Sequence, residues 1–309
     1  MVVREVANGV FLIDVFDMGI PNRTAAYLVR DEKCVLIDVG SARSKEHVIN
    51  GLQEIGLKED DLHFIVLTHI HIDHAGGVGW LLEDFPHTRV VVHPKGSPHL
   101  IDPEGLKAST RKARNSYPFH PCDFLPVAAE KITVGKDGQQ LRLGKRTLTL
   151  IETPGHAPHC LCIHDDLTSG IFVGDSLGLK IDYVLEGDKY EVALPAMVPP
   201  RFEPQKALSA TEKLARFDPE ILYYSHFGST RDVRRLMEKY RVAVQRSLEI
   251  AENLKNKEVD RETAFAQIYT WILKEILEIP EEKFEKIGGE MKISLELNTL
   301  GLLGYIFNK

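Results

Sequence analysis

The most constraining feature of the sequence is a cluster of metal-capable side chains in residues 68–77, Thr-His-Ile-His-Ile-Asp-His-Ala-Gly-Gly. It follows the apolar run 64–67, which has the composition of a short buried strand. Imidazole nitrogens and carboxylate oxygens are ligands that zinc and the neighbouring transition metals accept. Packing gives no reason to gather so many protonatable rings in one turn. The sequence therefore predicts a metal site at the end of this strand.

The spacing within the cluster predicts that its side chains face two separate points. His69 and His71 are two residues apart and can point the same way. Asp73 and His74 come where a helix is expected to begin, so they can face a second point nearby. The glycines that follow allow this helix to approach its neighbours closely.

Composition narrows the class of protein. The 309 residues are long enough for one large domain with an appendage or for two domains. A net charge of −7 argues against a nucleic-acid-binding surface, which needs basic patches. The first residues do not resemble a signal peptide, no run is long enough to span a bilayer, and the 4 cysteines are too few for a disulfide framework. We therefore expect a cytoplasmic protein without a membrane partner.

Short apolar runs bounded by turn residues predict two blocks of strands, separated or flanked by helices at 44–55, 80–85 and 207–217. The expected strands are residues 10–15, 24–29, 34–37, 64–67 and 89–92, then 131–134, 140–143, 148–151, 161–164, 171–173 and 221–224. Two segments, 97–126 and 180–204, lack clear periodicity and are interpreted as loops, with a short helix at 107–115 in the first. Helical spacing dominates after residue 230. The sequence predicts a catalytic domain of residues 1–230 and a helical region of residues 231–309.

Three later residues share one context, a strand that ends in a turn with a metal-capable side chain. They are His156 in Thr-Pro-Gly-His, Asp175 in Val-Gly-Asp-Ser and His226 in Tyr-Ser-His-Phe-Gly. Together with the cluster they resemble the five metal-binding motifs of the metallo-β-lactamase superfamily, in order, over residues 10–230. The resemblance implies an α+β fold, a four-layer αβ/βα sandwich with two mixed β-sheets between helices and a C-terminal helical appendage.

The resemblance also implies a site for two divalent metal ions, zinc in the first instance, with iron or manganese as alternatives. One ion would be held by His69, His71 and His156. The other would be held by Asp73, His74 and His226, and Asp175 would bridge the two.

Such a site implies a metal-dependent hydrolase, in which a hydroxide held between the ions attacks an electrophilic carbon or phosphorus. Asp73 and Asp175 are the candidate catalytic residues, which would orient the nucleophile or shuttle its proton. Two divalent ions, two carboxylates and one hydroxide leave about one positive charge, which suits a small anionic or carbonyl-containing substrate.

The cluster is most similar to the thioester-hydrolase and lactonase branch typified by glyoxalase II, and segments 155–159 and 195–202 resemble a prokaryotic group without an assigned substrate. We expect a small ester, thioester or lactone as substrate. Two alternatives stay open. One is a mononuclear iron persulfide dioxygenase using His71, His156 and Asp175, and the other is a phosphodiesterase or nuclease of the same superfamily.

Substrate contacts are predicted from His159 and from the apolar side chains of the irregular segments, Tyr183, Met197, Phe202 and Phe119. Strand packing for His159 and core packing for the other four are the competing interpretations. In residues 231–309 the charges alternate in sign, which is typical of solvated helix faces. These C-terminal helices are the expected surface for a partner or for a second copy in a homo-oligomer.

Overall fold

The computed structural model describes residues 3–113, 123–185, 187–198, 202–286 and 289–307. The chain forms two compact units. Unit 1 consists of Met1–Glu152, His159–Gly174 and Phe217–Arg231, and unit 2 consists of Thr153–Pro158, Asp175–Arg216 and Asp232–Lys309. The division into independent domains at residue 230 stays a prediction.

Unit 1 contains a seven-stranded sheet in the order β1-β2-β3-β4-β5-β6-β7. The strands are β1 Val3–Ala7, β2 Val10–Asp14, β3 Ala25–Val29, β4 Cys34–Ile37, β5 Leu62–Val66, β6 Arg89–Val92 and β7 Ile132–Val134. The first four form an antiparallel meander, whereas β4 to β7 are parallel neighbours. Parallel neighbours need long crossovers, and these carry α1 Lys45–Glu54, α2 Ile72–Ala75, α3 Val78–Asp84, α4 Ser97–Ile101 and α5 Glu104–Ala113.

A second sheet of unit 1 has six strands in the order β15-β14-β11-β10-β9-β8. They are β8 Gln140–Arg142, β9 Thr147–Glu152, β10 Leu161–Asp165, β11 Gly170–Gly174, β14 Ile221–Tyr224 and β15 Gly228–Thr230. The pair β11 and β14 is parallel and the other pairs are antiparallel, so this sheet is mixed as well.

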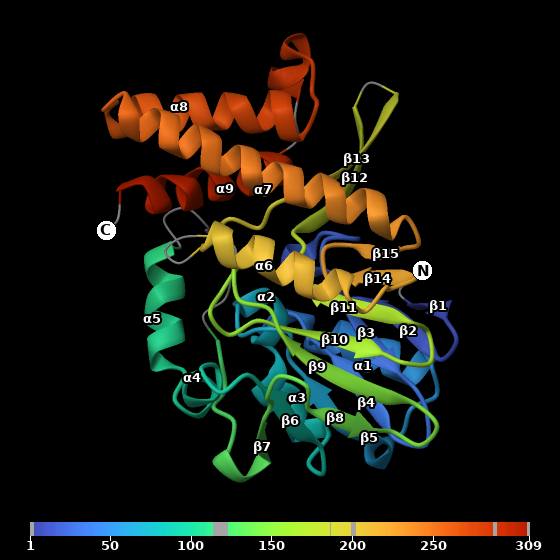
Figure 1. Ribbon diagram of the computed structural model, residues 1–309. Helices are drawn as coiled ribbons and strands as arrows, with labels where there is room; N and C mark the ends of the chain where they lie inside the picture. The colour runs from blue at the N-terminus through green and yellow to red at the C-terminus, as the bar shows by residue number, and fades with distance from the viewer. Residues whose placement is uncertain (1–2, 114–122, 186, 199–201, 287–288, 308–309) are drawn as a thin grey trace. The chain divides into compact units, whose positions relative to one another are not determined.

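The two faces of the first sheet are buried in different cores, as β4 illustrates. Successive side chains of a strand point to opposite faces. Cys34 and Leu36 join the cluster that contains the residues of α1 and α3, and Val35 and Ile37 join the cluster shared with the second sheet. Figure 1 shows the resulting stack of the two sheets. A strand buried on both faces explains why the sequence there is a continuous apolar run.

Unit 2 contains a hairpin and most of the long helices. These elements are β12 Leu179–Leu185, β13 Asp188–Leu194, α6 Pro204–Ala215, α7 Val233–Asn256, α8 Arg261–Trp271, a π-helix at Ile272–Ile276, a 3₁₀ helix at Glu281–Lys286 and α9 Gly289–Phe307. Asp260 caps α8 by accepting hydrogen bonds from the backbone N–H groups of Glu262 and Thr263.

The structure corrects two expectations. The segment 180–204 was expected to be irregular, yet it contains the hairpin β12–β13, whose strands pair directly from Leu179↔Leu194 to Leu185↔Asp188. Charged residues interrupt the continuous apolar run by which the other strands were identified. The alternation of apolar and charged residues in β12 was the signal that could have identified the hairpin. The described residues of segment 97–126 contain two helices, α4 and α5, where one short helix was expected at 107–115.

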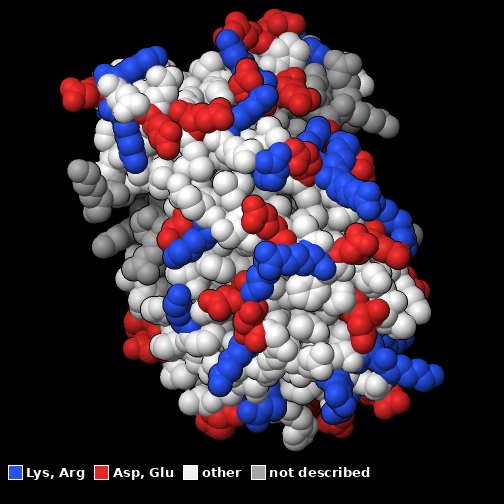
Figure 2. Space-filling model, viewed as in Figure 1, with Lys and Arg blue, Asp and Glu red and all other residues white. Residues whose placement is uncertain are grey.

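The predicted α+β class with two mixed sheets and a helical C-terminal region is confirmed. Among the described helices, none combines the length and apolarity that a membrane span requires. On the face in Figure 2, basic and acidic side chains are interspersed.

Candidate metal centre

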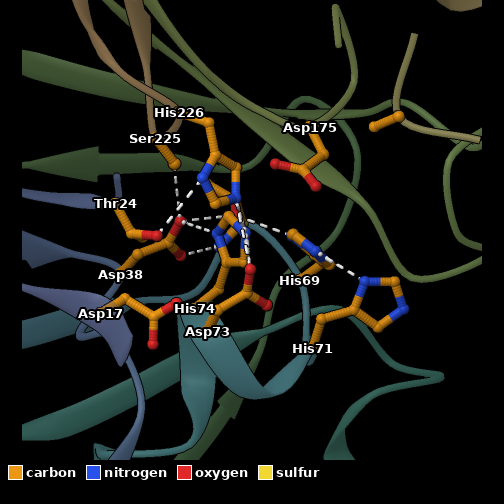
Figure 3. A network of polar contacts seen from close by, with 12 residues as sticks. Asp17, Thr24, Asp38, His69, His71, Asp73, His74, Asp175, Ser225 and His226 are labelled. Carbon is orange, nitrogen blue, oxygen red and sulfur yellow. Dashed lines mark hydrogen bonds and ion pairs between the residues drawn. The ribbon is translucent and has the colours of Figure 1, made fainter. Parts of the chain in front are cut away.

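The metal-capable residues of unit 1 follow the carboxyl ends of strands. Residues 68–71 follow β5, Asp73 and His74 lie on α2, and His226 follows β14. Because β4 and β5 are parallel neighbours, the residues after both strands meet at one edge of the sheet. The fold thus brings side chains from both sheets to one place within unit 1 (Figure 3).

Three of these side chains form a triangle of ligand atoms. Nε2 of His74 lies 3.2 Å from Nε2 of His226, and Asp73 Oδ2 lies 3.3 Å from His226 Nε2 and 3.8 Å from His74 Nε2. Zinc ligands at ~2.0–2.1 Å in tetrahedral geometry stand roughly 3.3 Å apart. The three residues therefore form a group that could hold a metal ion.

The tautomers of these two histidines are determined by their other ring nitrogens. Nδ1 of His74 lies 2.8 Å from Asp38 Oδ2, and Nδ1 of His226 lies 2.8 Å from the backbone oxygen of Arg23. Carboxylate and carbonyl oxygens only accept, so each Nδ1 carries the hydrogen and each Nε2 presents a lone pair. A cation placed between these two nitrogens would be bound by both lone pairs and by the neighbouring Asp73 carboxylate. This donor set fits a divalent metal.

A second pair of ligand atoms lies beside the first group. Nε2 of His69 is 3.0 Å from Nδ1 of His71, and both residues belong to unit 1. The ring centroids of His69 and His74 are 4.0 Å apart. His69 is fully buried, whereas His71 is partly exposed and can meet solvent or substrate.

Asp38 holds this arrangement together, and its role was not anticipated from the sequence. Its buried carboxylate accepts hydrogen bonds from the Thr68 backbone N–H at 2.8 Å, the Thr68 hydroxyl at 2.7 Å and the Ser225 hydroxyl at 3.0 Å, in addition to that from His74. Since Thr68 Oγ1 donates to Asp38, it accepts from His69 Nδ1 at 3.1 Å, which leaves Nε2 of His69 as a ligand. The sequence feature that could have indicated this role was an aspartate directly after β4, the strand that pairs with β5.

Unit 2 contains the other two predicted ligands. His156 Nε2 lies 3.4 Å from Asp175 Oδ2, and both side chains are buried. His156 Nδ1 donates to the backbone oxygen of Ala196 at 2.7 Å, so its Nε2 also presents a lone pair. The turn that carries His156 is tightly packed, because a Cβ on Gly155 would lie 2.6 Å from Ala207 Cα.

The predicted substrate contacts are distributed over both units. In unit 1, the His159 ring lies 5.6 Å from that of His71 and 6.2 Å from that of His69, between centroids. In unit 2, Met197 is 0% exposed and Phe202 is 4% exposed. Tyr183 lies in β12, and its side chain, like the whole of Phe119, lies outside the described residues. Substrate contact by these residues stays a prediction.

Known proteins resemble this chain over the same region. The sequence profile of the metallo-beta-lactamase superfamily matches residues 19–226, which include every predicted ligand. Human acyl-coenzyme A thioesterase MBLAC2 is 29% identical over 197 residues, which cover 59% of this chain and 68% of the human protein.

Solved structures share the fold. The archaeal metallo-beta-lactamase superfamily protein ST1585 from Sulfolobus tokodaii has a TM-score of 0.67 at 22% identity, over 96% of this chain and 98% of that chain. TTHA1429 from Thermus thermophilus, a metallo-beta-lactamase family protein, has a TM-score of 0.60 at 20% identity, over 98% of this chain and 94% of that chain. The sandwich fold expected from the sequence motifs is thereby confirmed.

Proposed function

The chain belongs to the metallo-β-lactamase superfamily, and from that premise we propose that it is a hydrolase with a dinuclear metal site that cleaves a small thioester, ester or lactone. The proposed ligands are His69, His71 and His156 for one ion, Asp73, His74 and His226 for the other, and Asp175 for both. Zinc is the proposed metal, because it accepts both imidazole and carboxylate ligands. Iron and manganese are the alternatives, because the set contains no thiolate.

One contact carries this proposal, the approach of the lone-pair nitrogens of His74 and His226 to 3.2 Å. With the Asp73 carboxylate beside them, they form a group of three ligand atoms that could hold a divalent cation. The ligand rings are oriented by Asp38, Thr68 and the Arg23 carbonyl, as ligating histidines usually are.

A bound divalent metal would lower the pKa of coordinated water to about 7 and polarise a carbonyl group. The chain's own contribution is to orient the ligands and to handle the proton. We assign Asp73 and Asp175 as the carboxylates that orient the attacking water and take up its proton. The partly exposed His71 and Asp73 are the ligand side chains of unit 1 that a substrate can reach.

The similarity to a protein named acyl-coenzyme A thioesterase supports the thioester among the three substrate types. A net positive dinuclear site also suits an anionic, carbonyl-containing substrate of this kind. We therefore place acyl thioesters first, with aryl esters and lactones as the other members of the test panel.

The test begins with elemental analysis of protein purified without added metal, followed by assays on acyl-coenzyme A thioesters, aryl esters and lactones. We expect two zinc ions per chain and hydrolysis of at least one class. In Asp73→Asn the rate should fall at least about 100-fold, because a ligand and a proton acceptor are lost. Asp166→Asn, a change at an exposed carboxylate of unit 1, is the matched control and should keep full activity.

Three outcomes contradict the proposal. One iron per chain with oxygen uptake on glutathione persulfide would identify the dioxygenase alternative. Cleavage of phosphodiesters without cleavage of the ester panel would identify the phosphodiesterase alternative. Equal turnover by Asp73→Asn and the unaltered protein would show that the proposed metal site takes no part in the reaction.

A further inference from the structure

The C-terminal helix α9 carries a buried asparagine with a contact outside its own helix. Asn298 is 2% exposed, and its side chain donates from Nδ2 to the Ser294 carbonyl at 2.9 Å. Its Oδ1 accepts a hydrogen bond from the backbone N–H of Met197 at 3.0 Å. By contrast, the neighbouring Thr299 is 0% exposed and donates only to Leu295 within the helix, at 2.8 Å, among the contacts described. Both polar groups of the Asn298 side chain are thus hydrogen-bonded, and one of these bonds joins α9 to the backbone of Met197.

Helix α9 lies directly against this backbone segment. A Cβ on Gly301 would lie 2.2 Å from the Met197 carbonyl oxygen and 2.5 Å from its carbon. No side chain fits there, so the segment is held at backbone contact by the helix. Asn298 and Gly301 are three residues apart and hold the same segment from one side of the helix.

The same peptide unit that Asn298 holds also orients a proposed metal ligand. The N–H of Met197 and the C=O of Ala196 belong to one planar peptide group, so fixing one fixes the direction of the other. The Ala196 oxygen accepts from His156 Nδ1 at 2.7 Å. That hydrogen bond keeps the proton on Nδ1 and turns Nε2 toward Asp175, at 3.4 Å.

We propose that Asn298 is a positioning residue for the metal ligand His156, acting through the Ala196–Met197 peptide. The inference rests on the proposed function, because it takes His156 to be a ligand. It assigns to the C-terminal helical region a direct part in building the site. The contacts that connect α9 with His156 through residues 196–197 all lie within unit 2.

The test compares metal affinity among full-length variants by competition with a chelator of known zinc affinity. Asn298→Ala should weaken zinc binding about tenfold, the lower end of what loss of an outer partner of a ligand costs. Asn298→Asp should stay within about threefold of the unaltered protein, because either form of the carboxyl group can accept from the Met197 N–H. Thr299→Val is the matched control on the same helix and should also keep its affinity.

Thermal unfolding separates positioning from general stability. Asn298→Asp and Thr299→Val are both expected to lower Tm, since one buries an acid and the other removes a buried hydrogen bond. A purely structural role for Asn298 would make metal affinity follow Tm across the three variants. Gly301→Ala displaces the adjacent Met197–Val198 peptide without touching Asn298. Because Met197 belongs to both peptides, this variant should also weaken zinc binding, which keeps the test usable if Asn298→Ala does not fold.

A second readout needs no metal. In metal-free protein, the ¹⁵N shifts of the His156 ring, assigned by their loss in His156→Gln, should show the Nδ1–H tautomer in the unaltered protein and a mixture in Asn298→Ala. The unaltered protein could bind no metal while its His156 tautomer still differs from that in Asn298→Ala. In that case the proposed function fails and the positioning role stands. If Asn298→Ala keeps both the tautomer and the zinc affinity of the unaltered protein, or if Thr299→Val loses as much affinity, the positioning role is overturned.

Discussion

The Nε2 atoms of His74 and His226 lie 3.2 Å apart, although 152 residues separate the two histidines in the chain. His74 is carried by the helix after β5, and His226 follows β14, so each of the two sheets of unit 1 contributes one ring. The hydrogen bonds at Nδ1 come from different elements again, Asp38 after β4 and Arg23 before β3. Loss of either of these hydrogen bonds should therefore displace the Nε2 atom of the same histidine ring.

Replacement of Asp38 by asparagine should weaken metal binding about 10–100-fold. The carboxylate accepts from four donors, and an amide in its place would turn an NH₂ group toward some of them. Zinc affinity measured by chelator competition checks this, with the exposed Asp166→Asn as control. Unchanged affinity in Asp38→Asn would show that His74 and Thr68 hold their positions without it.

Substitution of Gly77 by alanine should destabilise the protein by about 1–3 kcal/mol and weaken metal binding. An added Cβ would meet backbone oxygens of Ser41 at 2.9 Å and Val39 at 3.3 Å, so the turn after α2 must shift. Gly105→Ala is the control, because its Cβ would meet only His99 at 3.9 Å and alanine favours the exposed helix α5 by up to about 1 kcal/mol. Urea denaturation of both variants makes the comparison, and equal stability of the two would contradict it.

Removal of the buried Arg146 side chain should cost about 3–5 kcal/mol at neutral pH. Arg146 Nε lies 3.4 Å from Asp165 Oδ1, and both side chains are 0% exposed. Burial already raises the pKa of Asp165, and Arg146 opposes that rise. In Arg146→Met the pKa of Asp165 should rise further. The loss in free energy of unfolding should therefore be present at pH values above the unfolded-state pKa of Asp165. It should shrink as the pH falls and the carboxyl group becomes protonated.

Urea denaturation of Arg146→Met at pH 7 and pH 4.5 tests both parts, and Arg142→Met, at an exposed position of β8, is the control. A loss of stability that is equal at both pH values would contradict the role of the Asp165 charge. A loss no larger than that of Arg142→Met would show that the buried pair contributes nothing.

His164 should make the protein less stable in mild acid. Burial lowers the pKa of His164 below its ordinary value of 6.5, against the smaller opposing effects of Asp165 and Asp166. The unfolded state then binds the proton first as the pH falls, so stability is full above about pH 6.5 and declines below it. The decrease in Tm between pH 7.5 and pH 5.5 should be smaller in His164→Gln. The exposed His87→Gln is the control, and an identical pH dependence in all three proteins would contradict the prediction.

Much of the candidate metal centre could be proposed from the sequence because its signals are local. A run of ligand-type side chains after an apolar strand indicates a metal site whatever surrounds it, and His156, Asp175 and His226 share the same strand-end context. Most strands of both sheets were expected for the same reason, since two-sided burial leaves a continuous apolar run. The edge strands β1 and β15 were not expected. The hairpin β12–β13 was missed because charged residues interrupt that pattern.

The sequence by itself determined which side chains are available as ligands and at which strand ends they stand. Only the tertiary structure decided which nitrogen of each ring faces the centre, because the partner of the other nitrogen comes from a distant element. For His74 that partner is Asp38, and for His156 it is a peptide held by Asn298 on the last helix. Hydrogen bonds across such separations leave no periodicity in the chain, so they become visible only once the backbone has closed around them.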